Sequence, residues 1–390
     1  MLASVLTTVS SVYPAFLAGA LGVELRDALE ITERFFGLLI GGFFLGSALG
    51  STTLGRLGER FGARRMITVS LLTTASATMF IALFVRSGTA MICVLFVAGL
   101  ANSSGQTAAN KLLSQSIDPA RLGFAMAVKQ SGMPGASLLG GLAVPVIALT
   151  IGWQWGYALA TVLALFSLWA VLRFAPHDGP SQSVSTAQTT TEGKPARGAN
   201  GVLVSDRSTL ILAAVSAGFA SAAAGTLGNW VTSSAVDAGW SAGAAGLLLS
   251  LGAISGISVR MVLGWQADHN GKLPMRTASI SLGIGVLGAL LLAPRTQWTH
   301  ALAIILAFGA GWGWPALFNF AVVRTNPQAA SAATGITQTG VYVGVLSGPI
   351  VFGFLVENVS YEAGWIVIAC SMIIGAAIMA RLAPRFAAPS

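Results

Sequence analysis

Charged side chains are scarce in this chain. Asp, Glu, Lys and Arg together make up 9% of its 390 residues, against about 25% in ordinary globular proteins. Hydrophobic residues make up 54%. A water-soluble fold is excluded, because so few charges leave too little polar surface to cover a globular core. We therefore expect the membrane to be the solvent for most of the chain.

Histidine and cysteine, which build many metal and thiol sites, are also scarce. The three histidines, His177, His269 and His300, all lie in or beside expected loops. No nucleophile, metal-ligand cluster or phosphate-binding loop is recognisable, so the sequence disfavours an enzyme and predicts no cofactor and no metal. The two cysteines, Cys93 and Cys370, fall inside hydrophobic runs and are expected to be packed apolar thiols.

Long uninterrupted hydrophobic runs recur along the whole chain. They lie near residues 3–22, 35–55, 66–85, 90–113, 122–149, 153–173, 209–235, 241–264, 276–294, 299–323, 331–356 and 362–382. Each is long enough to cross about 30 Å of hydrocarbon as a helix, and none alternates polar and apolar residues as a barrel strand would. The first run has no basic leader and no small-residue cleavage site, so we expect a retained helix rather than a signal peptide. The sequence predicts an all-α integral membrane protein with about twelve transmembrane helices.

Lysine and arginine are concentrated in alternate loops. If the N-terminus is cytoplasmic, the cytoplasmic loops and tail hold Arg56, Arg60, Arg64, Arg65, Lys111, Arg121, Arg173, Lys194, Arg197, Arg207, Lys272, Arg276, Arg324, Arg381 and Arg385. The opposite loops hold only Arg26, Arg34, Arg86 and Arg295. This asymmetry predicts that both termini are cytoplasmic in a bacterial-type inner membrane. The net charge of +8 is therefore a topology signal and does not indicate a nucleic-acid partner.

One long polar segment divides the chain into two related parts. Residues 177–206 are rich in Ser, Thr, Gln, Gly and Pro, which predicts a flexible cytoplasmic linker. The expected units are a six-helix bundle, the linker, a second six-helix bundle and a cytoplasmic tail, at 1–173, 174–208, 209–382 and 383–390.

The two expected bundles are similar in sequence at a nearly constant separation. The coinciding positions are Asp118 and Asn326, Pro119 and Pro327, Gln130 and Gln338, Gly132 and Gly340, Gly140 and Gly348, Gly156 and Gly364, and Glu59 and Asp268. Matches spread over both bundles indicate a duplication. Transporters with parallel repeats bind their substrate near the bilayer midplane between the repeats, and we expect the site there.

A charged loop with spaced glycines is expected between the second and third helices. Residues 55–65 read Gly-Arg-Leu-Gly-Glu-Arg-Phe-Gly-Ala-Arg-Arg, and a weaker copy spans residues 264–272. This segment resembles the signature loop of the major facilitator superfamily, with Glu59 in place of the usual Asp. The gating residues implied by the resemblance are Gly55, Glu59, Arg60, Gly62, Arg64, Arg65, Gly264, Asp268 and Gly271.

The resemblance implies twelve helices in two pseudo-symmetric bundles and alternating access. It also implies that the loop latches the bundles together on the cytoplasmic side. A merely basic loop that obeys the topology rule would explain the arginines, but it would not explain the repeated glycine–acid–glycine spacing.

Two cations, Lys129 and Arg260, fall well inside expected transmembrane helices. A charge in hydrocarbon costs about 2.5–3.5 kcal/mol on insertion scales, and such residues usually face a cavity. All 13 acidic residues lie in loops or at helix ends, so no carboxylate is available as a partner. We therefore expect the substrate to supply the negative charge.

Each of these cations has a second interpretation. Arg260 and Gly264 resemble the Arg-x-x-x-Gly pattern of monocarboxylate and oxalate/formate transporters, where the resemblance implies that the arginine binds the substrate carboxylate. Arg260 could instead reach the cytoplasmic surface or brace the signature loop. Lys129 is either substrate-facing or structural, and the small residues after it, 132–141, partly resemble the fifth-helix motif of proton-coupled drug exporters.

Polar and aromatic residues on the other expected path-lining helices complete the candidate site. They are Tyr13, Asn102, Gln106, Asn110, Asn229, Trp230, Trp312, Trp314, Asn319, Gln338 and Tyr342. Any one of them could be an interhelical hydrogen bond or a packing residue. As a set they offer the few polar groups and aromatic walls that orient a small ligand.

The sequence therefore predicts a secondary transporter, acting as a monomer, for a small organic anion such as a carboxylate, a sulfonate or a cyanate-like ion. The alternative is a proton-coupled exporter of hydrophobic or cationic drugs, which usually needs a buried carboxylate. Exchange for another anion, or proton uptake through a peripheral acid such as Glu24 or Asp27, is the expected coupling. A membrane sensor would need a soluble signalling domain, and the linker is too short and polar to be one.

Overall fold

The computed structural model describes residues 1–116, 122–175, 205–270, 273–326 and 330–386, and at helical positions 52–60, 111, 114–116, 122–123, 268, 270 and 330–332 it describes the backbone alone. The described residues form helices and no strand. Among them are 12 helical segments long and apolar enough to cross a membrane. The predicted all-α membrane fold is confirmed.

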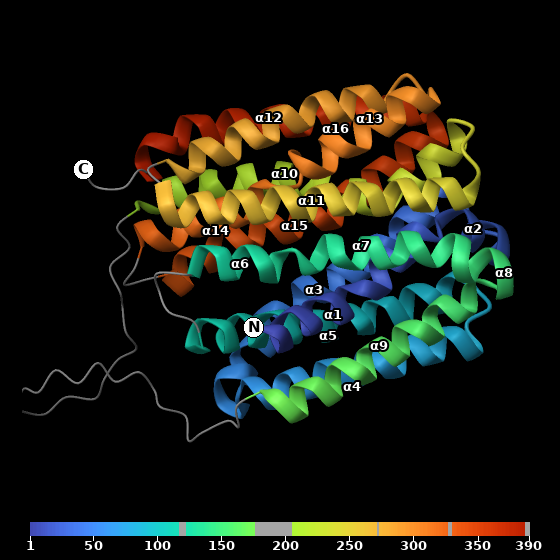
Figure 1. Ribbon diagram of the computed structural model, residues 1–390, viewed down its shortest axis with the longest axis horizontal. Helices are drawn as coiled ribbons and strands as arrows, with labels where there is room; N and C mark the ends of the chain where they lie inside the picture. The colour runs from blue at the N-terminus through green and yellow to red at the C-terminus, as the bar shows by residue number, and fades with distance from the viewer. Residues whose placement is uncertain (117–121, 176–204, 271–272, 327–329, 387–390) are drawn as a thin grey trace, which may run out of the picture.

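The chain folds into two halves that lie side by side (Figure 1). The N-terminal half consists of α1 (Leu2–Ala20), α2 (Gly22–Leu29), α3 (Glu33–Phe61), α4 (Ala63–Phe84), α5 (Gly88–Ser116), α6 (Leu122–Gln130), α7 (Gly132–Ala143), the π-helical segment η2 (Val144–Ala148), α8 (Leu149–Ile151) and α9 (Trp153–Phe174). The C-terminal half consists of α10 (Arg207–Asp237), α11 (Ala242–Asn270), α12 (Pro274–Leu292), α13 (Gln297–Gly309), α14 (Trp314–Thr325), α15 (Ala330–Asn358), α16 (Tyr361–Leu382) and the 3₁₀ turn η4 (Ala383–Phe386). We call the end where α9 stops and α10 starts the linker end, and the opposite end the α2 end.

Several helix starts are fixed by side-chain caps. The side chains of Thr32, Asp206, Thr296 and Ser360 each accept a hydrogen bond from the backbone N–H three residues further on. Such caps satisfy N–H groups that have no partner in the first helical turn. They mark the residues at which α3, α10, α13 and α16 begin.

Two helices predicted to be continuous are broken. The expected helix 122–149 is divided at Ser131 into α6 and α7 and ends in a π-helical segment, and the expected helix 299–323 is divided by a turn at residues 310–313. Prolines account for part of both breaks, because Pro134 and Pro315 have no N–H for the helical ladder. Each break lies inside one continuous apolar run, so a hydropathy profile does not detect the break.

The outer surface of the helices is apolar. Leu72, Phe80 and Trp169 are among the many exposed large hydrophobic side chains, as expected where lipid replaces water. Cys93 and Cys370 are free and exposed on this surface, so the prediction of packed thiols is wrong. Their helices turn these positions outward, and an apolar thiol costs little against hydrocarbon.

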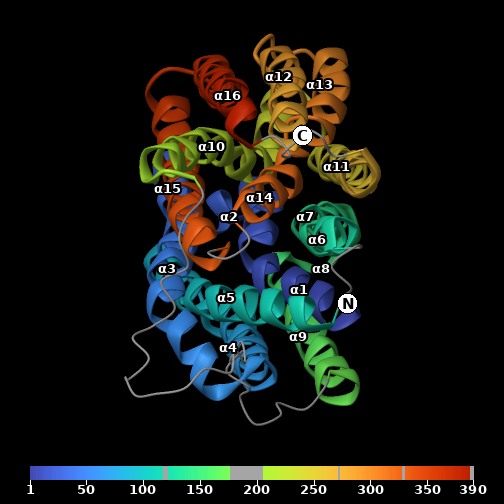
Figure 2. The same ribbon diagram turned by 90° about the vertical axis from the view of Figure 1, so that its left-hand side faces the viewer.

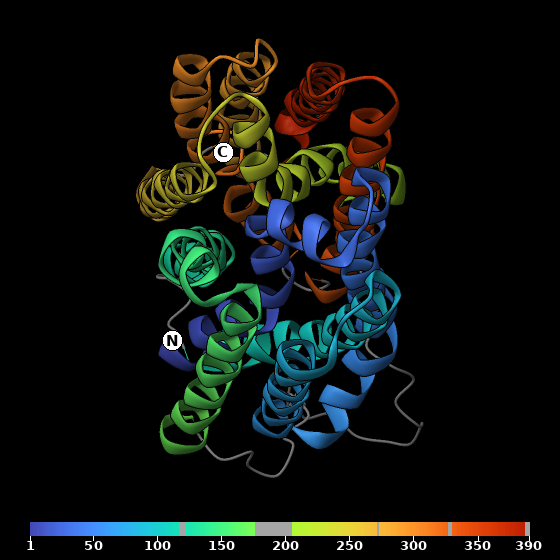
Figure 3. The ribbon, with the colours of Figure 1, turned by 90° about the vertical axis from the view of Figure 1, so that its right-hand side faces the viewer.

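The halves meet along three pairs of neighbours. Helix α3 packs against α15, α11 packs against α6 and α7, and α1 packs against α10. Figure 2 shows the first two of these contacts from the linker end. In Figure 3, which looks onto the α2 end, the short helix α2 lies beside α10. The expected midplane site would lie between these pairs.

Candidate functional site

The two halves are joined tightly near the α2 end. A Cβ atom on Gly37 of α3 would lie 2.7 Å from the Pro349 carbonyl oxygen of α15, which shows how closely these backbones approach. The backbone N–H of Arg34 donates to Glu357 Oε2 at 2.8 Å, and Arg26 Nη1 donates to Ser233 Oγ at 3.0 Å. The structure therefore shows a conformation in which the two halves are joined at the α2 end.

Both predicted intramembrane cations are buried. Lys129 is 3% exposed and Arg260 is 1% exposed, so neither side chain faces lipid or water. Lys129 lies in the last turn of α6, and its Nζ donates to Gln106 Oε1 at 2.5 Å. Arg260 lies on α11 of the opposite half. Its burial argues against the interpretation that it reaches the cytoplasmic surface.

Arg260 is held by backbone carbonyl groups from both halves. Its Nε and Nη2 donate to the Trp312 carbonyl oxygen at 2.9 and 2.6 Å, and its Nη1 donates to the Gln130 carbonyl oxygen at 2.5 Å. The guanidinium also lies over the Trp312 ring, 5.2 Å from its centroid. The described contacts thus occupy all three nitrogens of the guanidinium, and none of these contacts is with a carboxylate.

Both carbonyl groups lie at the helix breaks. Gln130 is the last residue of α6, and Trp312 lies in the turn between α13 and α14. The C-terminal end of a helix carries a partial negative charge, and discontinuous transmembrane helices use such ends to hold cations. This arrangement stabilises Arg260 without fully neutralising its charge.

A chain of neutral polar side chains extends from Lys129 into the N-terminal half. Gln106 Nε2 lies 3.4 Å from Asn102 Oδ1. Asn102 Oδ1 accepts from Ser11 Oγ at 3.0 Å, and its Nδ2 donates to Ser47 Oγ at 3.1 Å. The chain fixes the orientation of the Gln106 amide but brings no negative charge to Lys129.

The aromatic candidates divide into two groups. Trp312 lies beside Arg260, with its ring centroid 5.5 Å from that of Phe16 in α1. Trp230 instead packs between Phe36 and Phe352, at 5.0 and 5.3 Å, among the residues that join the halves near the α2 end. The structure therefore places Trp312 at the cations and Trp230 in the contact between α3, α10 and α15.

The remaining candidates lie on several helices of both halves. Trp314 and Asn229 are buried, and Trp314 Nε1 and Asn229 Oδ1 have no hydrogen-bond partner among the described residues. Gln338 and Asn319 are half-buried. The other candidates are Tyr13, which is buried in α1, Asn110, which is exposed, and Tyr342, whose hydroxyl contacts the Ser51 and Gln338 side chains.

Sequence reasoning missed the main partner of Arg260 in the N-terminal half. That partner is the Gln130 carbonyl group, which no side-chain pattern marks. The signal that could have found it is Pro134, four residues later. In a helix the carbonyl of residue 130 would pair with the N–H of residue 134, and proline has none.

Part of the predicted gating loop lies outside the described residues. This applies to the side chains of Glu59, Arg60 and Asp268, and to Gly271, whereas Gly55 and Gly264 lie within helices α3 and α11. Gly62 has φ +89° and forms the turn between α3 and α4, as glycine readily does. Arg64 donates to the Leu172 carbonyl oxygen in the last turn of α9, and Arg65 follows it in α4. The latch between the halves stays a prediction.

Glu24, an acidic residue outside the membrane-spanning segments, has a raised pKa. Burial raises the pKa of Glu24 in α2, nearby Asp27 raises it further, and Arg26 partly offsets the rise. Glu24 Oε2 is buried without a hydrogen-bond partner among the described residues. This carboxyl group therefore takes up a proton at a higher pH than an ordinary glutamate.

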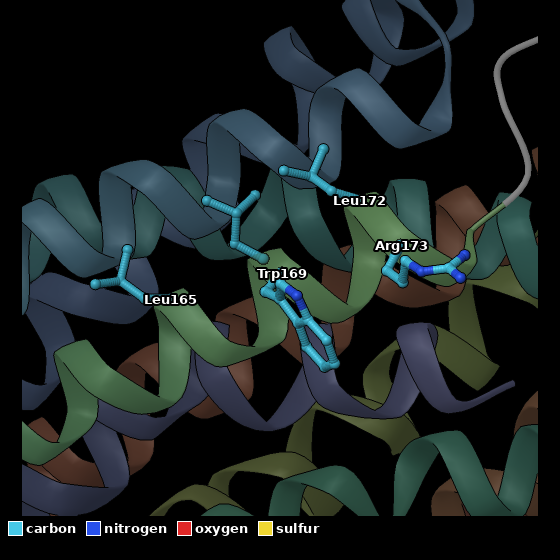
Figure 4. A pocket seen from close by; sticks show the side chains of 5 residues that line it. Leu165, Trp169, Leu172 and Arg173 are labelled. Carbon is cyan, nitrogen blue, oxygen red and sulfur yellow. The ribbon is translucent and has the colours of Figure 1, made fainter.

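A shallow hollow on α9 is not part of this site. It is lined by Leu165, Leu168, Trp169, Leu172 and Arg173 (Figure 4). Most of these side chains are exposed on the outer surface of the N-terminal half. In a membrane this surface faces lipid.

Comparison with known proteins shows the family to which the chain belongs. The sequence model of the Major Facilitator Superfamily matches residues 1–344. A gentisate transporter of Corynebacterium glutamicum is 25% identical, over 95% of this chain and 84% of that protein. A probable nitrate/nitrite transporter, NarK2, of Mycobacterium tuberculosis is 26% identical over 92% of this chain and 89% of its own length. A hexuronate transporter of Bacillus subtilis is 26% identical over 41% of this chain and 40% of its length. With 12 candidate membrane spans and a family match over most of its length, this chain is a multi-pass membrane transporter that belongs to the major facilitator superfamily.

Proposed function

We propose that this chain is a secondary transporter that moves a small organic anion, such as a carboxylate, a sulfonate or a cyanate-like ion, by alternating access. The observation that carries this proposal is the pair of buried cations. The described partners of Lys129 and Arg260 are amide and carbonyl oxygens, which are neutral. Two of the relatives that cover most of the chain are named for gentisate and for nitrate or nitrite, which are anions.

Charge balance explains why an anion fits this site. A buried charge without a counter-ion is costly, and helix ends and carbonyl groups offset that cost only in part. An anion between α6 and α11 would lie beside both cations. The planar guanidinium of Arg260 can bind a carboxylate or sulfonate through two parallel hydrogen bonds, which an ammonium group cannot do.

The membrane and the orientation belong to the same proposal. The excess of Lys and Arg in alternate loops supports a bacterial-type inner membrane with both termini in the cytoplasm. In this orientation the α2 end faces away from the cytoplasm. The contacts near the α2 end would then close the site on the outer side, and rocking of the halves would break them. We propose that one chain is sufficient for transport.

The experiment that tests the proposal is uptake of gentisate, nitrate and glucuronate into proteoliposomes. Arg260→Lys keeps the charge but loses the two-pronged geometry, so it should abolish most transport. Lys129→Gln removes a charge and should raise the KM. Arg295→Lys is the matched control, because Arg295 is a half-exposed arginine paired with Asp237 at 2.7 Å near the α2 end.

Two results would contradict the proposal. The first is normal transport of every anion by both Arg260→Lys and Lys129→Gln at unchanged thermal stability. The second is efflux of cationic dyes that needs no added anion and is unchanged in Arg260→Lys. This result would favour the drug-exporter alternative. Thermal shift of the purified protein with each anion gives an independent measure, because a ligand that binds the folded state alone raises its stability.

A further inference from the structure

The hydrogen bond between Arg260 and Gln130 joins the two halves, unlike the other described hydrogen bonds of the guanidinium. Nε and Nη2 donate to the Trp312 carbonyl oxygen, which belongs to the same half as Arg260. Nη1 alone donates across the interface, to the Gln130 carbonyl oxygen at 2.5 Å. Loss of the Nη1 bond would therefore remove one hydrogen bond between α11 and α6 and leave Arg260 anchored within its own half.

Pro134 is the reason that the Gln130 carbonyl group is available. The helical bonds on either side are intact, since Ser131 N donates to Ala127 O and Gly135 N donates to Ser131 O, both at 2.9 Å. The acceptor whose helical donor would be residue 134 is Gln130, and proline has no N–H. The break thus leaves one specific carbonyl group without its helical partner.

A free carbonyl group in the middle of a membrane needs a donor, because water is not there to supply one. Arg260 supplies it, and in doing so uses a donor that an anion would also use. Nη1 has two N–H groups, but an anion bound to it would lie beside the Gln130 carbonyl oxygen, and the negative charge would repel the partly negative oxygen. The carbonyl oxygen and the anion therefore compete at this nitrogen. A charged acceptor forms the stronger bond to a guanidinium, so an anion of suitable shape can displace the carbonyl group.

We propose that the Gln130 carbonyl group is an internal competitor of the substrate anion at Arg260, and that Pro134 is the positioning residue that keeps it available. The inference rests on the proposed function, since it needs an anion at Arg260. When the anion takes Nη1, the bond between the halves at this level is lost. Binding is thereby linked to the relative movement of α6 and α11.

The test is a variant in which residue 134 has the backbone N–H that proline lacks. In Pro134→Ala the new N–H can pair with the Gln130 carbonyl oxygen inside the helix, so the competitor is weakened. The Kd for nitrate or gentisate, measured by calorimetry on the purified full chain, should fall by up to about tenfold. The maximal rate of transport should not rise with the affinity. In this variant the bond between Arg260 and the Gln130 carbonyl group is already weakened, so anion binding no longer breaks it. Pro134→Gly adds the same N–H and serves if the alanine variant folds poorly.

The native cysteines provide a second readout without further mutation. Cys93 on α5 and Cys370 on α16 are free, exposed and in different halves, so spin labels on both report the distance between the halves. In the wild type, the anion should change the distribution of distances. In Pro134→Ala, part of that change should be present before anion is added.

Two controls separate the positioning role from a general effect on helix shape. Pro14→Ala removes another proline inside a buried helix of the same half, and it should leave the Kd and the label distances as in the wild type. In the Arg260→Lys background, Pro134→Ala should change the label distances far less than in the wild type, because the two effects are coupled.

The outcomes distinguish this inference from the proposed function. If the wild type binds anion in a manner that depends on Arg260, yet Pro134→Ala leaves both Kd and distances unchanged, the inference is wrong and the transport proposal stands. The inference is also wrong if Pro134→Ala and Pro14→Ala have the same effect. If the wild type binds none of the probe anions and Arg260→Lys changes nothing, the proposed function itself fails.

Discussion

The site depends on how individual residues pair two buried positive charges. An ordinary ion pair in this chain, Arg295 with Asp237, joins Nε to a carboxylate oxygen at 2.7 Å. Among the described residues, Lys129 and Arg260 have hydrogen bonds of similar length, and all of these are to neutral oxygens. The bonds satisfy donors without cancelling charge. Because their charge is not cancelled, Lys129 and Arg260 are suited to bind an anion reversibly.

The first prediction concerns Gln106, the described partner of Lys129. Gln106→Glu places a carboxylate at about the position of the amide oxygen, so Lys129 gains a permanent counter-ion. We expect the variant to fold at least as stably as the wild type and its KM for the anion to rise by about tenfold. Proteoliposome uptake and thermal unfolding measure the two quantities.

Gln106→Met is the matched control for this change. It removes the amide at similar volume and leaves Lys129 buried without its partner, which should cost about 1–3 kcal/mol of stability. Anion binding should then offset part of that loss. Unchanged transport in Gln106→Glu would show that the charge of Lys129 does not act on the substrate.

At this scale the sequence predicted the cations and named their neighbours Gln106 and Trp312 as candidates, but it did not predict the backbone carbonyl groups that hold Arg260. Lys129 and Arg260 are recognisable because each is a charge within an apolar run, which is a local property. Their burial depends on how α6 and α11 face each other, and a single sequence does not contain that information. Trp230 shows the same limit, since its helix is assigned correctly but its partners, Phe36 and Phe352, place it near the α2 end.

At the scale of elements, the broken helices matter most. The turn at residues 310–313 and the break at Ser131 each lie inside an apolar segment of normal spanning length. Hydropathy measures composition, so it predicts the span and misses the break. Proline and glycine are the only local signs, and many transmembrane helices tolerate them without breaking: Pro14 and Pro349 lie within α1 and α15.

The short helix α2 was not predicted as an element, and the second prediction concerns its acid, Glu24. Burial raises the pKa of Glu24, so folding favours its protonated form. Stability should therefore fall as the pH rises from the unfolded pKa through the folded pKa, because the folded state must then hold a buried charge. Glu24→Gln, which mimics the protonated form, should be more stable than the wild type at pH 8, and the gap should close as the pH falls to about 4.

Thermal unfolding in detergent between pH 8 and about pH 4 measures the difference in stability between Glu24→Gln and the wild type. Uptake at the same pH values tests whether transport is coupled to protons. Glu30→Gln is the control, since Glu30 is an exposed acid at the end of the same helix and does not act on the pKa of Glu24. A gap that is constant with pH would mean that the carboxyl group of Glu24 does not titrate differently in the folded state. If the uptake of Glu24→Gln keeps the pH dependence of the wild type, peripheral proton uptake does not pass through Glu24.

For the whole molecule, composition and the signature motif determined the confirmed predictions, which are the all-α membrane fold and the family. Twelve apolar runs require no knowledge of contacts, because hydrocarbon allows few alternatives to a helix bundle. The same argument gives nothing about which conformation the halves adopt. That property depends on small differences between two sets of contacts, and the structure shows one conformation, in which the halves are joined at the α2 end.

The third prediction uses those contacts. Glu357 Oε2 accepts from the backbone N–H of Arg34 at 2.8 Å and joins α15 to the start of α3, across the two halves. Asp237 pairs with Arg295 at the same end but within one half. If the α2 end opens during transport, Glu357→Ala should favour the open arrangement, whereas Asp237→Ala should lower stability without favouring either arrangement.

Spin labels on Cys93 and Cys370 measure this difference directly. We expect Glu357→Ala to broaden the distribution of distances toward arrangements that the wild type adopts rarely, and to change the KM and the maximal rate together, because it alters a conformational step. The effect should be modest, since the pair is exposed and solvent weakens it. Identical distributions in Glu357→Ala, Asp237→Ala and the wild type, with normal transport in all three, would mean that this contact does not control the opening of the α2 end.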